Sequence, residues 1–572
     1  MSPLSLRRVL PITDWLGNYQ RPDLRSDLAA GLTIAAMLIP QGMAYALLAG
    51  LPPEIGLYAS TLPVLAYAIF GTSRQLAVGP VAIVSLLTAS ALSPLYEQGT
   101  TGYVSAAALL AIMVGLVHLV LGLGRLGFIV NFLSHSVLVG FTAAAAIIIG
   151  FSQVKHILGV NTDRKDHFYE TVIDVVQALG DTHGTTLALG AGSIAGLLGI
   201  KRISPRIPGA LIIVVATTVI AASANLADDG VSTVGSIPDS LPAFGLPGIS
   251  GGLVGDLAVT ALVITMVGFM ESIAVAKVYA RRHRYEVEPN QELVALGMAN
   301  VTSGVFGGYP VTGGFSRTAV NDTAGARTPL ASIITALLVL VSIAFFTPLF
   351  TNLPKAALGA IIIVAVINLI DIAEMRHIAT VKRSDTVGMG VAFVGTLAVG
   401  IELGILIAVV ASMLVVFARM SRPHTAVLGR IPDTTSYRNI VRFPEAVQAA
   451  GVRIIRIDAA LSFVNSQYVK RLLLAEADPS DGRRRVVLDC SGINDIDATG
   501  AETLSEIITE FAESPVELHL CDVKGPVRDV LHRSGLWDEL GSRIHATPHQ
   551  AVDGELVIDP RSSGIDERGV SV

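Results

Sequence analysis

Residues 307–322, GGYPVTGGFSRTAVND, place an arginine among glycines and a proline, between two long apolar runs. The Arg317 guanidinium keeps its charge in proteins and presents a planar fork of N–H donors that fits an oxyanion. Charged side chains are costly at the centre of a bilayer, so they usually line a water-filled path. The pattern favours an anion-binding role for Arg317 beside Ser316. The alternatives are that Arg317 snorkels towards the cytoplasm or forms a permanent ion pair.

A carboxyl group lies in a second apolar run, GFMESIAVAK, at Glu271. No lysine stands four residues further along, so a local helical ion pair is excluded. A buried carboxyl near a guanidinium is able to bind and release a proton, and its protonated form would not repel a dianion. Glu271 is therefore a candidate proton-coupling group. The alternative is a purely structural ion pair between Glu271 and Arg317.

A third apolar run, MLIPQGMAYALLAG, contains an amide and a phenol. Gln41 and Tyr45 stand four residues apart, on one face of a helix, and follow the helix-interrupting Pro40. Both side chains donate hydrogen bonds without adding charge, which suits an anion site. Packing or anchoring at the membrane interface is the alternative role for Tyr45.

Two of the apolar segments are interrupted in matching ways. AVGPVAIVSLLT in the third segment and GGYPVTGGFSRT in the tenth each have a glycine and a proline among their first four residues. A separation of seven segments inverts the second half of the chain relative to the first, as in transporters with inverted repeats. Helices that begin inside the membrane present unpaired N–H groups, which attract an anion. A helix kink or close packing is the alternative. The breaking residues are Gly79, Pro80, Gly308 and Pro310.

The composition predicts an integral membrane protein. Of the 572 residues, 52% are hydrophobic and 15% charged, and the mean hydropathy is +0.62, which is too apolar for a soluble protein of this size. The net charge of -6 differs from the excess of positive charge that is typical of nucleic-acid-binding proteins. Basic residues collect in alternate loops, which indicates an even number of spans with both ends cytoplasmic. About fourteen segments are expected, at 27–49, 54–71, 78–94, 103–123, 128–155, 184–200, 207–225, 253–279, 291–306, 309–323, 328–347, 355–372, 386–400 and 402–419.

The last part of the chain has the charge density of a soluble domain. Strands are expected at 452–459, 484–491 and 516–523, with helices at 499–512 and 526–535, which predicts a small α/β domain. The turn SGINDIDATG leads to Thr499, whose hydroxyl is expected to cap the helix, with phosphorylation as the alternative. The expected divisions are a cytoplasmic segment at 1–25, a membrane domain at 26–422, a cytoplasmic domain at 430–552 and a disordered tail at 553–572.

Four ordered motifs carry a resemblance to a known family. They are LTIAAMLIPQGMAYALLAGLPPEIGLYAS, RQLAVGPVAI, GGYPVTGGFSRTAVND and VVLDCSGINDIDATG, and the likeness extends over roughly residues 20–550. Together they resemble the SulP family of sulfate permeases and related anion transporters. The resemblance implies a membrane all-α fold of fourteen segments in two inverted sets of seven, grouped as core and gate, and a cytoplasmic STAS domain. It also implies a homodimer, elevator-like movement, and an anion site formed by Gln41, Tyr45, the backbone near Val81 and Ala82, Glu271, Ser316 and Arg317.

The leading expectation is a plasma-membrane transporter that takes up sulfate with a proton. Sodium-coupled bicarbonate relatives have an aspartate where this chain has Glu271, which favours protons and sulfate. The alternatives are bicarbonate or dicarboxylate symport, chloride exchange, a channel, a nucleobase permease, or a receptor signalling through its STAS domain. An enzyme is not expected, nor is any cofactor or metal, because no nucleophile–base pair, metal cluster or phosphate-binding loop is recognised. The candidate regulatory residue of the STAS turn is Thr499.

Overall fold

The computed structural model describes residues 10–128, 134–162, 167–204, 208–238, 240–248, 251–479 and 482–553, apart from the side chains of Glu402 and Ile405. By its internal contacts the chain separates into two compact units, Met1–Ser412 and Met413–Val572. Each unit is described by itself. The tail expected to be disordered lies outside the described residues, except for Asp553.

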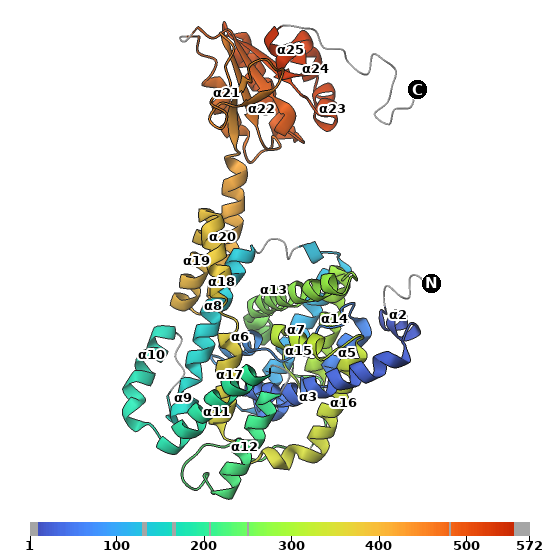
Figure 1. Ribbon diagram of the computed structural model, residues 1–572, viewed down its shortest axis with the longest axis vertical. Coiled ribbons are helices and arrows are strands. Elements are labelled where there is room, and N and C mark those ends of the chain that lie inside the picture. The colour runs from blue at the N-terminus through green and yellow to red at the C-terminus, as the bar shows by residue number, and fades with distance from the viewer. Residues whose placement is uncertain are drawn as a thin grey trace. The chain divides into compact units, whose positions relative to one another are not determined.

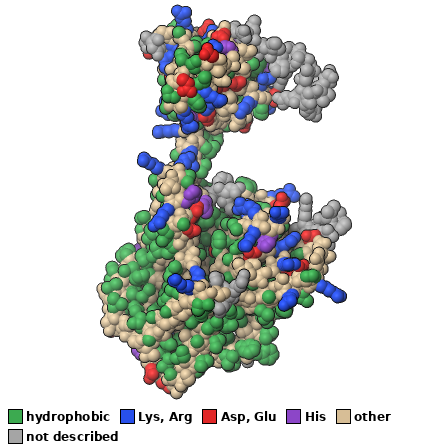
Figure 2. Space-filling view, viewed as in Figure 1, with side chains coloured by type: hydrophobic (Ala, Val, Ile, Leu, Met, Phe, Trp, Pro, Cys, Tyr) green, Lys and Arg blue, Asp and Glu red, His purple; other side chains and the backbone are tan. Residues whose placement is uncertain are grey.

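The first unit is helical (Figure 1), and apolar side chains cover much of the face seen in Figure 2. Eight helices among the described residues are long and apolar enough to cross a membrane, and shorter apolar helices accompany them. Every expected segment contains a helix. The helices are α2 (Ile12–Gly17), α3 (Arg21–Leu48), α4 (Pro53–Tyr58), α5 (Leu62–Phe70), α6 (Ala82–Leu92), α7 (Thr101–Leu123), α8 (His135–Ser152), α9 (Val154–Leu158), α10 (Phe168–Gln177), α11 (Gly184–Ile203), α12 (Gly209–Ser223), α13 (Gly251–Arg282), α14 (Pro289–Val305), α15 (Phe315–Thr323), α16 (Leu330–Phe346), α17 (Lys355–Ile367), α18 (Ile372–Val381), α19 (Arg383–Val399) and α20 (Ile401–Ser421).

Glycines allow helices of the first unit to approach closely. A Cβ atom at Gly115 of α7 would lie 2.6 Å from the backbone nitrogen of Val301 in α14. A Cβ atom at Gly304 of α14 would lie 2.3 Å from the carbonyl oxygen of Ala108 in α7. Helices in lipid associate through such small residues because packing replaces the hydrophobic driving force. The contact fixes α14, which supports the candidate site.

The second unit is built on a six-stranded sheet in the order β4-β3-β5-β6-β7-β8. Strand β3 is antiparallel to β4 and β5, whereas β5 to β8 run parallel. Apolar side chains of β5, β6 and β7 pack against α21, α22 and α23 to form its main core. The strands are β3 (Thr425–Arg430), β4 (Tyr437–Asn439), β5 (Val452–Ile457), β6 (Arg485–Asp489), β7 (Glu517–Cys521) and β8 (Ile544–His545), and the helices are α21 (Ser466–Leu474), α22 (Ala498–Ala512), α23 (Gly525–Arg533), α24 (Leu536–Leu540) and α25 (Pro548–Asp553).

The fold class expected from the sequence is confirmed, with a helical membrane part followed by a small α/β domain. One local expectation is wrong. The N-cap of α22 is Asp497, whose carboxylate accepts a hydrogen bond from the Gly500 N–H at 2.7 Å. Because Asp497 occupies the capping position, Thr499 falls within the first turn, where its side chain is exposed.

Candidate anion-binding site

The two interrupted segments lie side by side. Strand β1 (Val78–Gly79) pairs antiparallel with β2 (Thr312–Gly313), so that Val78 faces Gly313 and Gly79 faces Thr312. Helix α6 begins three residues after β1, and α15 begins two residues after β2. The short ladder therefore brings the starts of two helices together from opposite halves of the first unit.

Side chains of neighbouring helices satisfy the backbone around β2. The Asn300 amide of α14 donates to the Val311 carbonyl and accepts from the Val311 N–H, both at 2.9 Å. The Ser272 hydroxyl of α13 accepts from the Gly313 N–H at 2.9 Å. The Thr312 hydroxyl donates to the Gly268 carbonyl at 2.6 Å. Unwound backbone is tolerated at membrane depth only when its polar groups are satisfied in this way.

A second set of hydrogen bonds joins the segment before α6 to α15. The Ala77 N–H donates to the Thr318 hydroxyl, and the Gly314 N–H donates to the Ala77 carbonyl, both at 3.1 Å. The Asn321 amide donates to the Gln75 carbonyl at 2.9 Å. These bonds fix α15 relative to the start of α6. Neither helix has a side-chain N-cap, because Val81 and Gly314 occupy those positions, and uncapped first-turn N–H groups favour a nearby anion.

Arg317 is buried beside this junction, with 2% of its surface exposed. Its Nη1 donates to the Pro80 carbonyl at 2.6 Å, whereas its Nε and Nη2 are buried without a hydrogen-bond partner. Within the described part of the chain the guanidinium forms no ion pair. The guanidinium is thus oriented by one backbone bond and retains donors for another group.

Two glycines lie beside this guanidinium, and Gly314 makes room for it. A Cβ atom at Gly314 would lie 3.0 Å from Nη2, and one at Gly79 would lie 3.6 Å from it. Gly79 also has a φ of +153°, a conformation that other residues rarely adopt. The backbone conformation therefore requires the glycine in the third segment.

Other polar groups surround Arg317 within electrostatic range. They are the Glu271 carboxyl of α13, the Tyr45 hydroxyl of α3 and the Tyr309 hydroxyl. The Glu271 Oε2 atom is buried and has no hydrogen-bond partner, whereas Tyr309 hydrogen-bonds Ser85 of α6 at 2.8 Å. The arrangement combines one fixed positive charge, neutral hydroxyl groups and one carboxyl group with an oxygen that has no hydrogen-bond partner.

The expected site residues differ in how much of their surface is exposed. Gln41 and Tyr45 are each 6% exposed, whereas Ser316 is exposed. Val81 and Ala82 are buried where α6 begins, and Pro80 provides the carbonyl that binds Arg317. Gly308 and Pro310 are buried between α14 and β2, where the backbone leaves the helical path. Six further polar residues around the site carry no signal in the sequence that predicts them: Ser85, Ser272, Asn300, Tyr309, Thr312 and Thr318.

A cavity of about 440 Å³ adjoins the site residues of α3 and α6. Its lining includes Ala44, which precedes Tyr45, and Leu86, one helical turn after Ala82. Elsewhere the lining includes two lysines, Lys155 and Lys355. A cationic cavity therefore lies within about one helical turn of the candidate anion site.

Comparisons with known proteins agree along nearly the whole chain. A family model described as the sulfate permease family matches residues 24–392, and a STAS domain model matches residues 443–551. The chain is 37% identical to sulfate transporter 4.1, chloroplastic, of Arabidopsis thaliana, with 98% of this chain and 84% of the relative covered. It is 36% identical to a probable sulfate transporter of Mycobacterium tuberculosis, with 91% and 93% covered. The solved structure of a murine solute carrier 26 anion transporter, in an inward-facing state, matches with a TM-score of 0.89 and 27% identity, covering 97% of this chain and 95% of that one.

Proposed function

The chain belongs to the sulfate permease family, and from that premise we propose that it takes up sulfate together with a proton across the plasma membrane. It is a multi-pass membrane protein and an anion transporter by family. Sulfate is favoured because the relatives named above, which cover nearly all of this chain, are themselves named sulfate transporters. We further propose that both ends of the chain are cytoplasmic and that the protein is a homodimer.

The observation that carries the proposal is the unpaired donor set of Arg317. Its Nε and Nη2 have no partner, and the guanidinium lies where two uncapped helices begin. Sulfate is a tetrahedral dianion whose oxygens accept two parallel N–H bonds from one guanidinium. In this proposal the N–H groups near Val81 and Ala82, with donors from Gln41, Tyr45 and Ser316, complete the shell around the anion.

Glu271 provides the coupling step of the proposal. An ionised carboxylate near Arg317 would neutralise the guanidinium and repel a dianion, whereas a protonated carboxyl leaves the positive charge for sulfate. Binding of the proton and of sulfate therefore favour each other, as linkage requires. Release of the proton on the cytoplasmic side then weakens sulfate binding and drives its release. The lack of a permanent partner for Oε2 supports this role.

We propose that the helices that carry the site move together in an elevator-like way. This movement would open the site to one side of the membrane and then to the other. Helices α3, α6, α13 and α15 all contribute residues near Arg317, so they would move together to keep the anion shell intact. The second unit, proposed as the cytoplasmic STAS domain at 430–552, is not needed to form this shell.

The test is uptake of labelled sulfate by the purified protein in liposomes. Uptake is expected when the outside is acidic, and Glu271→Gln is expected to abolish its dependence on the proton gradient. Arg317→Ala is expected to abolish sulfate binding in a panel that includes bicarbonate, chloride and fumarate. Uptake that ignores both the gradient and Glu271→Gln would rule out proton coupling. A steady chloride current without gradient dependence would instead identify a channel or exchanger.

A further inference from the structure

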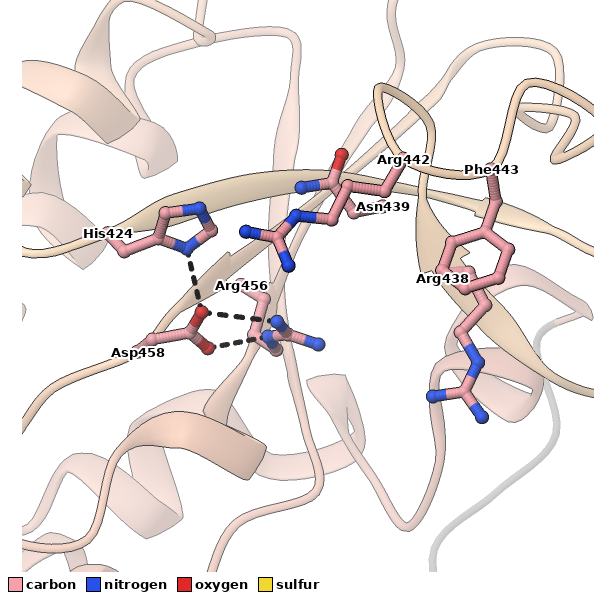
Figure 3. A pocket seen from close by; sticks show the side chains of 7 residues that line it. All are labelled: His424, Arg438, Asn439, Arg442, Phe443, Arg456 and Asp458. Atoms are coloured by element: carbon pink, nitrogen blue, oxygen red, sulfur yellow. Dashed lines mark hydrogen bonds and ion pairs between the residues drawn. The ribbon is translucent and has the colours of Figure 1, made fainter. Parts of the chain in front are cut away.

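The second unit carries an arginine-rich pocket that is separate from the membrane site. The pocket has a volume of about 380 Å³ and lies beside β3, β4 and β5 (Figure 3). Three arginines line it, Arg438, Arg442 and Arg456, against a single carboxylate, Asp458. Such an excess of guanidinium groups in one hollow attracts anions.

The single carboxylate of the pocket is already paired. The Asp458 Oδ1 atom accepts from Arg456 Nε at 2.6 Å, and Oδ2 accepts from Arg456 Nη2 at 3.1 Å and from His424 Nδ1 at 2.8 Å. The Arg456 hydrogen bond lowers the pKa of Asp458 from its ordinary value, so the carboxylate stays ionised at neutral pH. Asp458 is therefore occupied by Arg456 and His424 and does not neutralise the remaining arginines.

Arg442 is the arginine that this arrangement leaves available. Within the described part of the chain its guanidinium has no hydrogen bond or ion pair with a side chain. Figure 3 shows it extending from the loop after β4 towards the Arg456–Asp458 pair, with the Asn439 amide beside it, whereas Arg438 points away from this group. The charge of Arg442 has no carboxylate partner among the residues that line the pocket, and a bound oxyanion would supply one.

The pocket follows closely after an apolar helix along the chain. Helix α20, apolar along Leu406–Ser421, ends three residues before His424, which lines the pocket. Three residues of extended chain span roughly 10 Å at most. The stretch between them also contains Arg422. Basic groups this close to a membrane-spanning helix meet the phosphate groups of anionic lipids.

We propose that the pocket binds a phosphate group, held between Arg442 and Arg456 with a further donor from Asn439. The phosphate belongs to an anionic phospholipid at the membrane surface or to a soluble phosphate ester. In both cases its oxygens accept charge-assisted bonds from the guanidinium groups. The site lies in the second unit, so the proposal goes beyond anion transport and does not depend on the cargo carried past Arg317.

Binding to the full-length protein in detergent tests the proposal, with ATP and short-chain phosphatidic acid as probes and phosphatidylcholine as the uncharged control. At least one phosphate probe is expected to bind, more weakly as salt is raised. Arg442→Gln is expected to weaken that binding about tenfold or more, as loss of charge-assisted bonds does. Arg438→Gln, the matched change on the side chain that points away, is expected to alter it less than about twofold.

The outcomes separate the two sources of phosphate. Binding of phosphatidic acid alone identifies a lipid headgroup site, and binding of ATP identifies a site for soluble phosphate esters. The proposal is overturned if neither probe binds, if Arg442→Gln binds as the unchanged protein does, or if Arg438→Gln is equally damaging. An unchanged melting temperature confirms that the exposed Arg442 has been altered without unfolding the protein. Sulfate uptake is not the readout, so failure here leaves the proposed transport function untouched.

Discussion

At the scale of single residues, Arg317 is a buried charge whose donors are only partly used. One of its donors is used by the Pro80 carbonyl, which fixes the orientation of the guanidinium, while Nε and Nη2 have no partner. Burying N–H donors without partners costs free energy. An anion that accepts from them recovers that cost, and little of the site has to be reorganised when the anion arrives.

The planar shape of the guanidinium is expected to matter as much as its charge. Arg317→Lys keeps a positive charge but loses the fork of donors, so sulfate affinity should fall by about 10- to 100-fold, the range expected for one or two charge-assisted hydrogen bonds. Equilibrium binding of sulfate measures the change. The control is Arg327→Lys, at a largely exposed arginine that pairs with Asp23. Equal affinity in the Arg317→Lys protein would contradict bidentate binding.

Space beside the guanidinium provides a second prediction. Gly314→Ala would put a methyl group 3.0 Å from Nη2 of Arg317, so the guanidinium must shift. Overpacking of this kind costs about 1 kcal/mol or more, and sulfate affinity should fall about fivefold or more. Gly390→Ala in α19 is the matched change, because nothing lies within 4 Å of its added Cβ atom. A Gly314→Ala protein with full affinity would show that the position of this guanidinium is not critical.

At the scale of elements, the interrupted segments depend on the helices around them. Residues between α14 and α15 have left the helical path, so their N–H and C=O groups need partners from outside the segment. Asn300 and Ser272 provide these partners from α14 and α13. The interruptions of the helices are therefore stabilised by the helices packed around them, and glycine and proline alone do not account for them.

Removal of the Asn300 amide tests this dependence. Asn300→Ala leaves the Val311 N–H and carbonyl without their partner, and each buried unsatisfied group costs about 1–3 kcal/mol. The melting temperature in detergent should fall by several degrees, and sulfate binding should weaken because β2 precedes α15. Asn18→Ala, at an exposed helix end, is the control and should leave the melting temperature nearly unchanged. An unchanged Asn300→Ala protein would show that water or other groups satisfy the segment.

The sequence predicted the interrupted segments but not their support. Hydropathy predicted each span, and the glycine–proline pairs predicted where two of the spans are interrupted. Both features can be read from neighbouring residues in the chain. Asn300, Ser272 and Thr318 carry no such local signal, since a polar residue in a helix is ordinary until its partner's position is known. Thr499 was misjudged for a related reason, because Asp497, two residues earlier, accepts the Gly500 N–H instead.

At the scale of the whole molecule, each of the two units has a main hydrophobic core of its own among the described residues. One lies among the membrane helices and the other between the sheet and helices of the second unit. Cores that do not share side chains unfold as separate cooperative units. Scanning calorimetry of the purified protein should therefore resolve two transitions.

Acidification is expected to lower the temperature of the second-unit transition. His519 lies in β7, where burial lowers the pKa of its imidazole to about 4. Between an unfolded-state value near 6.5 and this folded value, the unfolded chain binds more protons, so the stabilisation present above pH 6.5 is lost as the pH falls towards 4. The transition should occur at a lower temperature at pH 5 than at pH 7.

Replacement of the histidine identifies the source of this pH effect. His519→Gln removes the titrating group and should reduce the difference between pH 5 and pH 7, whereas His549→Gln, at a partly exposed histidine of α25, should not. His519 is hydrogen-bonded to His545 and Glu517, and Arg485 lies within electrostatic range of it. A pH dependence that persists in the His519→Gln protein would assign the effect to another group.

The pairing of β1 with β2 also has a consequence for how the protein is made. Ala77 and Thr318, which hydrogen-bond beside this ladder, are 241 residues apart. At about 5–20 residues per second of translation, the first partner waits roughly 10 to 50 s on the ribosome before the second is synthesised. During that interval the N-terminal half carries β1 without its partner strand. The backbone polar groups of this segment then need other partners, such as water, until the second half is synthesised.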